Sequence, residues 1–129
     1  MEHEFQLRVY YEDTDLAGIV YYANYLKFIE RARTELVRSA GIDQKVLKNR
    51  DGIVFAVRRV EADYLAPAKF DDELSVVSSL KAISGARIVM RQIVTRAGQP
   101  LFDALVTLVA INETGRAVRL PASIRLNLG

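Results

Sequence analysis

Between residues 25 and 40, the apolar positions of the chain recur every three or four residues. This spacing places them on one face of an α-helix, while the charged residues of the segment lie largely off that face. The apolar positions are Tyr25, Phe28, Ile29, Ala32, Leu36 and Ala40. Gly41 follows directly, where helices commonly end in a left-handed cap. The pattern therefore predicts one long amphipathic helix that ends before Gly41.

Most of the remaining chain shows the alternation and the turn residues that are typical of β-strands. We predict strands over residues 3–11, 53–65, 74–83, 87–95, 101–111 and 116–119. Residues 43–50 are a polar stretch compatible with one or two helical turns, and the tail after Pro121 is left unassigned. Because residues 101–111 are nearly all apolar, we expect this strand to be central in a sheet.

Short turns between successive strands make those strands antiparallel neighbours. A sheet and a helix that each have one apolar face must cover each other, so we predict an α+β fold with a curved antiparallel sheet of five to six strands around the long helix. A chain of 129 residues forms one domain on the usual prior, here residues 1–129. One helix cannot cover both faces of the sheet, so we expect a homo-oligomer.

Composition excludes several classes of function. The chain has no cysteine and one histidine, His3, which argues against thiolate chemistry, a Ser-His-Asp triad and a zinc site. No metal and no cofactor are expected. The net charge of +2 is too small to indicate nucleic-acid binding. No apolar run reaches the ~20 residues of a membrane span, and the acidic N-terminus lacks a signal-peptide core, so we expect a cytoplasmic protein.

An acidic turn precedes the long helix. It contains Asp13 and Asp15, and Gly18 follows it; five of the six tyrosines fall between residues 10 and 25. Taken alone, an Asp-x-Asp turn before a helix is more often a solvated turn or a helix cap than a catalyst. A carboxylate beside a helix start and surrounded by aromatic rings is also an arrangement that can perform chemistry, because free N–H groups at a helix N-terminus stabilise negative charge.

The segment YxDTDxxGxVYxxNYxxFxERART resembles the signature of hotdog-fold acyl-CoA thioesterases. The most similar groups are the 4-hydroxybenzoyl-CoA thioesterase family and the bacterial Tol–Pal-associated thioesterases. The block from Tyr64 to Ala68 and the Asp72-x-Leu74-x-Val76 pattern extend the resemblance over most of the chain. It implies a sheet wrapped around the helix, no cofactor, and homodimers with the active site at the subunit interface that often pair into homotetramers.

Carried over by position, the resemblance implies that Asp15 is the catalytic carboxylate. The family's helix begins around residues 21–23, and its first free N–H groups hold the thioester carbonyl. Tyr22 occupies a position where many Tol–Pal-type members carry histidine and the hydroxybenzoyl type carries tyrosine, and we include it as catalytic. The residues that we expect to bind the substrate are Gly18, Ile19, Tyr21 and Tyr25 around the thioester, with Arg87 and Arg125 for the CoA phosphates.

The predicted reaction is hydrolysis of a small acyl-CoA, short-chain or aromatic, to the free acid and CoA. Asp15 acts either as general base on water or as a nucleophile, and the sequence does not choose between these roles. Two alternatives stay open. One is a thioesterase that acts on acyl carrier protein, and the other is a non-catalytic protein that binds acyl thioesters with the same fold.

Overall fold

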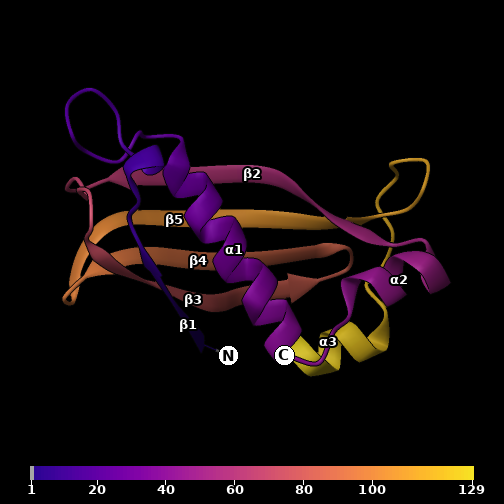
Figure 1. The fold of residues 1–129 in the computed structure, drawn as a ribbon. Helices are drawn as coiled ribbons and strands as arrows, with labels where there is room; N and C mark the ends of the chain where they lie inside the picture. The colour runs from indigo at the N-terminus through magenta and orange to yellow at the C-terminus, as the bar shows by residue number, and fades with distance from the viewer. Residues whose placement is uncertain (1) are drawn as a thin grey trace.

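A long helix crosses one face of a curved antiparallel sheet in the computed structural model, which describes residues 2–129 (Figure 1). Within these residues the strands are β1 (Glu2–Arg8), β2 (Val54–Tyr64), β3 (Glu73–Ser84), β4 (Arg87–Arg96) and β5 (Gln99–Ile111). The helices are α1 (Asn24–Ser39), α2 (Gln44–Asp51) and α3 (Ala122–Leu128), with a short 3₁₀ turn, η1 (Tyr11–Asp13). The predicted long helix and the five long strands are confirmed.

The five strands pair in the order β1-β3-β4-β5-β2, and every pair is antiparallel. The connection from β2 to β3 therefore runs from one side of the sheet to the other, at the left end in Figure 1. The expectation that residues 101–111 form an interior strand of the sheet is confirmed. β5 is paired on both sides, but β4 holds the middle position and β2 is added as an edge strand beyond β5.

The strand predicted over residues 116–119 is wrong. This segment makes one isolated β-bridge, between Ala117 and Ile111, and then leaves the sheet. The tail that was left unassigned forms α3, which buries Ile124 and Leu128. β1 ends at Arg8, three residues before the predicted end, because Val9 exchanges backbone hydrogen bonds with residues 71 and 72 instead of continuing the ladder.

The core lies between α1 and the sheet face that α1 covers. α1 buries Tyr25, Phe28, Ile29, Ala32, Leu36 and Val37, which include five of the six residues predicted for its apolar face. Alternate residues of β3, β4 and β5 meet them and are almost completely inaccessible to solvent. This burial of one face of each element is the main stabilising contribution to the fold.

One polar layer crosses this core and ties α1 to the sheet. Gln92 is fully buried on β4 and donates from Nε2 to the Ile29 carbonyl and to Ser78 Oγ, both at 2.9 Å. Its Oε1 accepts from Arg33 Nη1 at 3.0 Å. Burial lowers the pKa of Arg33. Because both ends of the Gln92 amide are hydrogen-bonded, the layer fixes how α1 sits on the sheet.

The edge strand β2 extends beyond the cover of α1. Val57, Val60 and Tyr64 pair with Leu108, Val106 and Phe102 of β5, so they point to the core face of the sheet. Their β5 partners are buried, but Val57 is 50%, Val60 39% and Tyr64 51% exposed. The α1 side of β2 is therefore an apolar strip that this chain leaves open.

Candidate active site

The loop that carries Asp15 is a tight hairpin between η1 and α1. Thr14 and Val20 form a β-bridge, and the Asp15 N–H donates to the Ile19 carbonyl at 2.9 Å. The Gly18 N–H returns to the Asp15 carbonyl at 2.9 Å, and Gly18 has φ +80°, a left-handed conformation that glycine adopts without steric cost. Gly18 thus turns the chain between the carboxylate and the helix, and its predicted contact with the substrate stays a prediction.

The Asp15 side chain is exposed at the end of this hairpin. One carboxylate oxygen accepts from the Ala17 N–H at 2.9 Å, and among residues 2–129 the group has no other hydrogen-bond donor and no cationic partner. A carboxylate held by one local bond keeps most of its acceptor capacity free.

Three backbone N–H groups near the start of α1 are free. The helix begins at Asn24, its N-cap is Ala23, and no side chain caps it. Within the described chain, the N–H groups of Tyr22, Ala23 and Tyr25 donate to no protein acceptor. Alanine is a poor N-cap because it offers no oxygen to these donors. The open end therefore presents unpaired N–H groups and the positive end of the helix dipole.

A cavity of ≈420 Å³ brings the carboxylate and the helix start together. It is lined by Asp15, Ile19, Val20, Tyr21, Tyr22, Tyr25, Tyr64, Leu65, Ala66 and Pro67. Five of the predicted site residues thus share one hollow, and Gly18 lies in the turn beside it. Tyr25 reaches the cavity from the core: it is only 3% exposed, stacks on Phe102 at 4.9 Å, and accepts from the Ala68 N–H at 3.0 Å.

Apart from Val20 in the hairpin, the lining residues that the sequence analysis did not predict come from the end of β2 and the loop after it. Tyr64 donates from its hydroxyl to the Tyr22 carbonyl at 2.8 Å, and Leu65, Ala66 and Pro67 complete that wall of the cavity. The Tyr-x-x-Pro-Ala block had indicated the family, and it could have identified this wall.

The cavity contains several tyrosines whose hydroxyls stay protonated at neutral pH. Burial, and then the neighbouring tyrosines, raise the pKa of Tyr64. Burial also raises the pKa of Tyr25, against a lowering by the Ala68 N–H. The Tyr22 side chain, followed by desolvation and the Asp15 carboxylate, raises the pKa of Tyr21. These groups can therefore donate hydrogen bonds, but they do not supply a phenolate.

Arg87 and Arg125 do not reach this cavity within one protomer. Val94 of β4 and Tyr64 of β2 both pair with Phe102, so Val94 marks the level of the cavity in the sheet. The distance from residue 87 to residue 94 along a strand is about 23 Å. Arg125 is in α3, which lies near the opposite end of α1 (Figure 1). Their assignment to the CoA phosphates stays a prediction.

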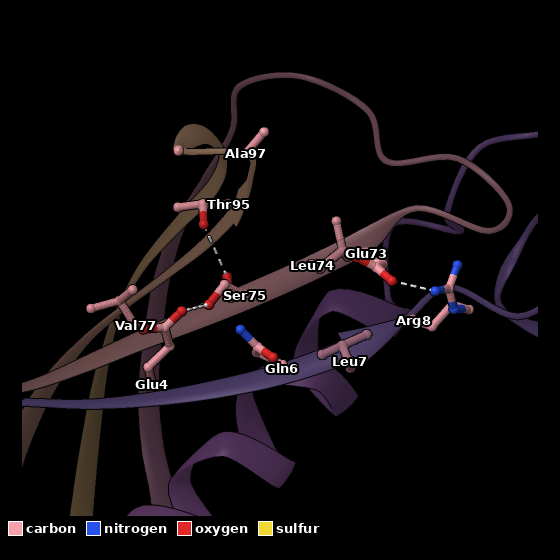
Figure 2. A pocket seen from close by; sticks show the side chains of 11 residues that line it. Glu4, Gln6, Leu7, Arg8, Glu73, Leu74, Ser75, Val77, Thr95 and Ala97 are labelled. Atoms are coloured by element: carbon pink, nitrogen blue, oxygen red, sulfur yellow. Dashed lines mark hydrogen bonds and ion pairs between the residues drawn. The ribbon is translucent and has the colours of Figure 1, made fainter.

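A second hollow, of ≈580 Å³, lies along β1, β3 and the β4–β5 turn (Figure 2). Its polar side chains interact with one another: Arg8 forms an ion pair with Glu73, and Ser75 Oγ donates to Glu4 at 2.5 Å. It does not combine a carboxylate with the open N-terminus of a helix, so we do not take it as the active site. In the described part of the chain, no cluster of ligand residues suits a metal, and no helix is long and apolar enough to cross a membrane.

A helix wrapped by an antiparallel sheet, with an exposed carboxylate in a cavity that it shares with the start of the helix, is the arrangement expected of a thioesterase of the hotdog class. The family model described as the thioesterase-like superfamily matches residues 9–128, and the chain belongs to this superfamily. The hotdog fold and the thioesterase family predicted from the sequence are confirmed.

Named relatives agree with this assignment. The acyl-CoA thioesterase YbgC of Haemophilus influenzae is 40% identical over 108 residues, which cover 84% of this chain and 79% of that protein. The acyl-CoA thioester hydrolase YbgC of Escherichia coli O6:H1 is 38% identical over 120 residues, 92% of this chain and 89% of the relative.

Solved structures show the same architecture. A probable thioesterase from Bartonella henselae superposes with a TM-score of 0.90 at 38% identity and covers 94% of this chain and 100% of its own. A 4-hydroxybenzoyl-CoA thioesterase complexed with 4-hydroxybenzoyl-CoA superposes with a TM-score of 0.94 over 99% of each chain. At 24% identity, this second similarity concerns the fold alone.

Proposed function

We propose that this thioesterase hydrolyses acyl-CoA to a free acid and CoA, with a site made of the Asp15 carboxylate and the N-terminal turn of α1. The observation that carries the proposal is the cavity that the two share. The acyl-CoA thioesterase names of the Haemophilus influenzae and Escherichia coli relatives support CoA as the carrier.

The N-terminal turn of α1 supplies the hydrogen-bond donors that stabilise the oxyanion. Attack on a thioester carbonyl places negative charge on its oxygen, and the free N–H groups of Tyr22, Ala23 and Tyr25 are donors of the kind that stabilises such an oxyanion. They are already in place and need no reorganisation. CoA leaves as a thiolate, which is a good leaving group, so the site needs no strong general acid.

Asp15 supplies the other part of the site. Its carboxylate is exposed and lightly hydrogen-bonded, as either a general base on water or a direct nucleophile requires. A single turnover in ¹⁸O-labelled water tests the nucleophile role: attack by Asp15 expels the CoA thiolate and forms an anhydride, and water that attacks the Asp15 carbon of this anhydride labels the carboxylate. General-base catalysis places the label in the product acid alone, so label in Asp15 identifies the nucleophile. Tyr22 contributes its backbone N–H and a ring at the mouth of the cavity, where it is 61% exposed.

The walls of the cavity favour a small acyl group. They are made largely of tyrosine rings and of Ile19, Val20, Leu65 and Pro67, and they enclose ≈420 Å³. This lining fits short-chain or aromatic acyl groups, which gain from apolar contact and ring stacking.

We also propose that the active form is a homodimer, or a homotetramer built from two dimers. β2 is an edge strand, so one side of its backbone is unpaired, and its apolar strip at Val57, Val60 and Tyr64 is open. Edges of this kind invite pairing with another chain. Because Tyr64 also lines the cavity, a second copy on this edge would help to enclose the site. A cytoplasmic location stays a prediction.

A screen of thiol release across acyl-CoA chain lengths and aryl-CoAs tests the proposed function. We expect turnover with small or aromatic acyl groups and less with long chains. The same acyl group on an acyl carrier protein should be a poorer substrate; a preference for the carrier would identify the alternative thioesterase. Tight binding of acyl-CoA with no turnover of any thioester would identify a binding protein instead.

A further inference from the structure

Tyr64 makes a long-range contact with the start of α1. It is the last residue of β2, and its hydroxyl donates to the Tyr22 carbonyl at 2.8 Å across 42 residues of sequence. Tyr22 directly precedes Ala23, the N-cap of α1. The edge strand is thus joined to the turn that carries the free N–H groups.

The contact acts on one particular peptide group. The Tyr22 carbonyl and the Ala23 N–H belong to the same planar unit, so fixing the direction of the carbonyl fixes the direction of the N–H on its opposite side. A hydrogen bond accepted by the carbonyl also polarises the peptide and strengthens the N–H as a donor. The Tyr64 hydroxyl therefore controls both the aim and the donor strength of the Ala23 N–H.

The flanking residues have several hydrogen-bond partners, whereas the Tyr22–Ala23 peptide itself has one in the described chain. The Tyr21 N–H donates to the Asp13 carbonyl at 2.9 Å, and Asn24 donates from Nδ2 to the same carbonyl at 3.0 Å. Within residues 2–129, the Tyr22 carbonyl accepts from Tyr64 alone and the Ala23 N–H has no acceptor. The Asn24 N–H donates to the Tyr21 carbonyl at 2.8 Å and closes a turn around this unit, and among residues 2–129 Tyr64 is the one group that hydrogen-bonds to the unit itself.

The ring of Tyr64 is itself well supported, so its hydroxyl is held in place. It packs edge-on against Phe102 with a centroid distance of 4.9 Å, against Tyr25 at 5.6 Å and against Tyr22 at 6.3 Å. These contacts belong to the ring and remain when the hydroxyl is removed. The ring and the hydroxyl can therefore be tested separately.

We propose that Tyr64 is a positioning residue, which holds the Tyr22 carbonyl and so fixes the turn whose free N–H groups receive the thioester oxygen. This inference rests on the proposed role of the α1 N-terminal turn. The charge on the oxygen is largest in the transition state, so the hydroxyl contributes mainly to kcat and little to ground-state binding.

The test is Tyr64→Phe, which keeps the ring and removes the donor. We expect kcat to fall on the order of tenfold or more, and KM to stay within about twofold. The affinity for an S-alkyl-CoA thioether should not change, because this ligand has no carbonyl. A melting temperature measured alongside separates these effects from unfolding. Tyr11→Phe is the matched control, since Tyr11 is 82% exposed outside the cavity and should keep the kcat of the parent chain.

A second variant keeps the proposal falsifiable if the first is unstable. Replacing Tyr64 by p-aminophenylalanine restores an N–H donor on the same ring and should recover most of the lost kcat. An unchanged kcat in Tyr64→Phe, a loss confined to KM, or no recovery with the amino group would overturn the positioning role. If Asp15→Asn is inactive while Tyr64→Phe is fully active, only this inference fails; if Asp15→Asn is active, the proposed catalytic role of Asp15 fails.

Discussion

Asp13 and Asp15 lie two positions apart in the same turn, but their carboxylates have opposite surroundings. Asp13 is 9% exposed and accepts the Tyr10 N–H at 2.8 Å, while its carbonyl holds the Tyr21 N–H. Asp15 is exposed, lines the cavity and, among the described residues 2–129, accepts only from the Ala17 N–H. The first carboxylate holds the loop together, and the second remains available for chemistry.

Asp15→Asn is therefore expected to abolish hydrolysis while the fold stays intact. Asparagine has nearly the same size and can still accept from the Ala17 N–H, so stability should change by no more than about 1 kcal/mol. It can neither take a proton from water nor act as a nucleophile, so kcat should fall on the order of 10²-fold or more. Thiol release, melting temperature and affinity for a non-hydrolysable acyl-CoA analogue are the measurements.

Asp13→Asn is the control for this experiment. Its amide oxygen can still accept the Tyr10 N–H, so we expect near-normal turnover and a stability loss on the order of 1 kcal/mol or less. If Asp13→Asn is inactive and Asp15→Asn is active, the catalytic carboxylate is Asp13 and the assignment to Asp15 is wrong. Near-normal turnover in both variants would remove Asp15 from the mechanism.

The open apolar strip of β2 leads to a prediction about assembly. The chain should run as a dimer or larger species in light scattering at micromolar concentration, above the 14.5 kDa of one chain. Val60→Lys places a charge in the middle of the strip, where burial against a second copy would desolvate it, and should shift the population toward monomer. Lys45→Ala, near the start of α2 and outside the strip, is a suitable control. A stable monomer of the unsubstituted chain would contradict the proposed assembly.

The prediction for Arg87 and Arg125 concerns salt. If exposed cations hold the CoA phosphates, added salt should raise KM through screening and leave kcat nearly constant. Arg87→Ala should then raise KM and flatten its salt dependence, and Arg125→Ala should do the same. Arg50→Ala, exposed on α2, is the control. Unchanged kinetics in a variant would show that this arginine does not bind the CoA phosphates.

Stability should depend on pH through Asp72. Burial raises the pKa of Asp72, but the Lys69 N–H at 2.8 Å and the Arg96 guanidinium at 2.7 Å outweigh it and lower the pKa overall. The ionised Asp72 carboxylate therefore stabilises the fold above the unfolded-state pKa of about 3.9. This stabilisation is lost as pH falls through the lower pKa of the folded state. At neutral pH, Asp72→Asn should lower the free energy of unfolding by roughly 0.5–1 kcal/mol, a range that allows for solvent screening. At the lowest pH it should have no effect, because Asp72 is then protonated.

Urea unfolding between about pH 2 and pH 7 measures this prediction through the linkage of protonation and folding. The difference in unfolding free energy between the parent chain and Asp72→Asn should shrink toward zero on acidification. A difference that is constant with pH would mean that the substitution acts through packing rather than charge.

The β4–β5 turn offers a stabilising substitution. Ala97 has φ 49° and Gly98 has φ 82°, so both central residues of this two-residue hairpin loop are left-handed. Alanine is strained there, whereas Asn-Gly is the favoured pair for such a turn. Ala97→Asn should raise the unfolding free energy by about 0.5–1 kcal/mol and leave kcat unchanged. Ala97→Val, which is β-branched, should lower it, and thermal melts compare the three chains.

The elements that depend on local pattern were predictable from the sequence. The three- and four-residue spacing from Tyr25 to Leu36 places these side chains on one helix face whatever packs against them, and α1 buries that face. The alternation over residues 74–83 and 87–95 likewise matches β3 and β4. The strand predicted over residues 116–119 is absent because an alternating pattern forms a strand only where it can pair along its length. Here Ala117 makes a single bridge, to Ile111.

The motif around Asp15 and Gly18 is enough by itself to indicate the family and the candidate carboxylate, because the hairpin and the helix start are built from residues adjacent in sequence. Only the tertiary structure decided which distant side chains join them. β2 lies at the sheet edge next to β5, and this order brings Tyr64 to the Tyr22 carbonyl and leaves Arg87 at the far end of β4. Strand order depends on how separate elements pack together, and the hydrophobic pattern of one strand does not contain it.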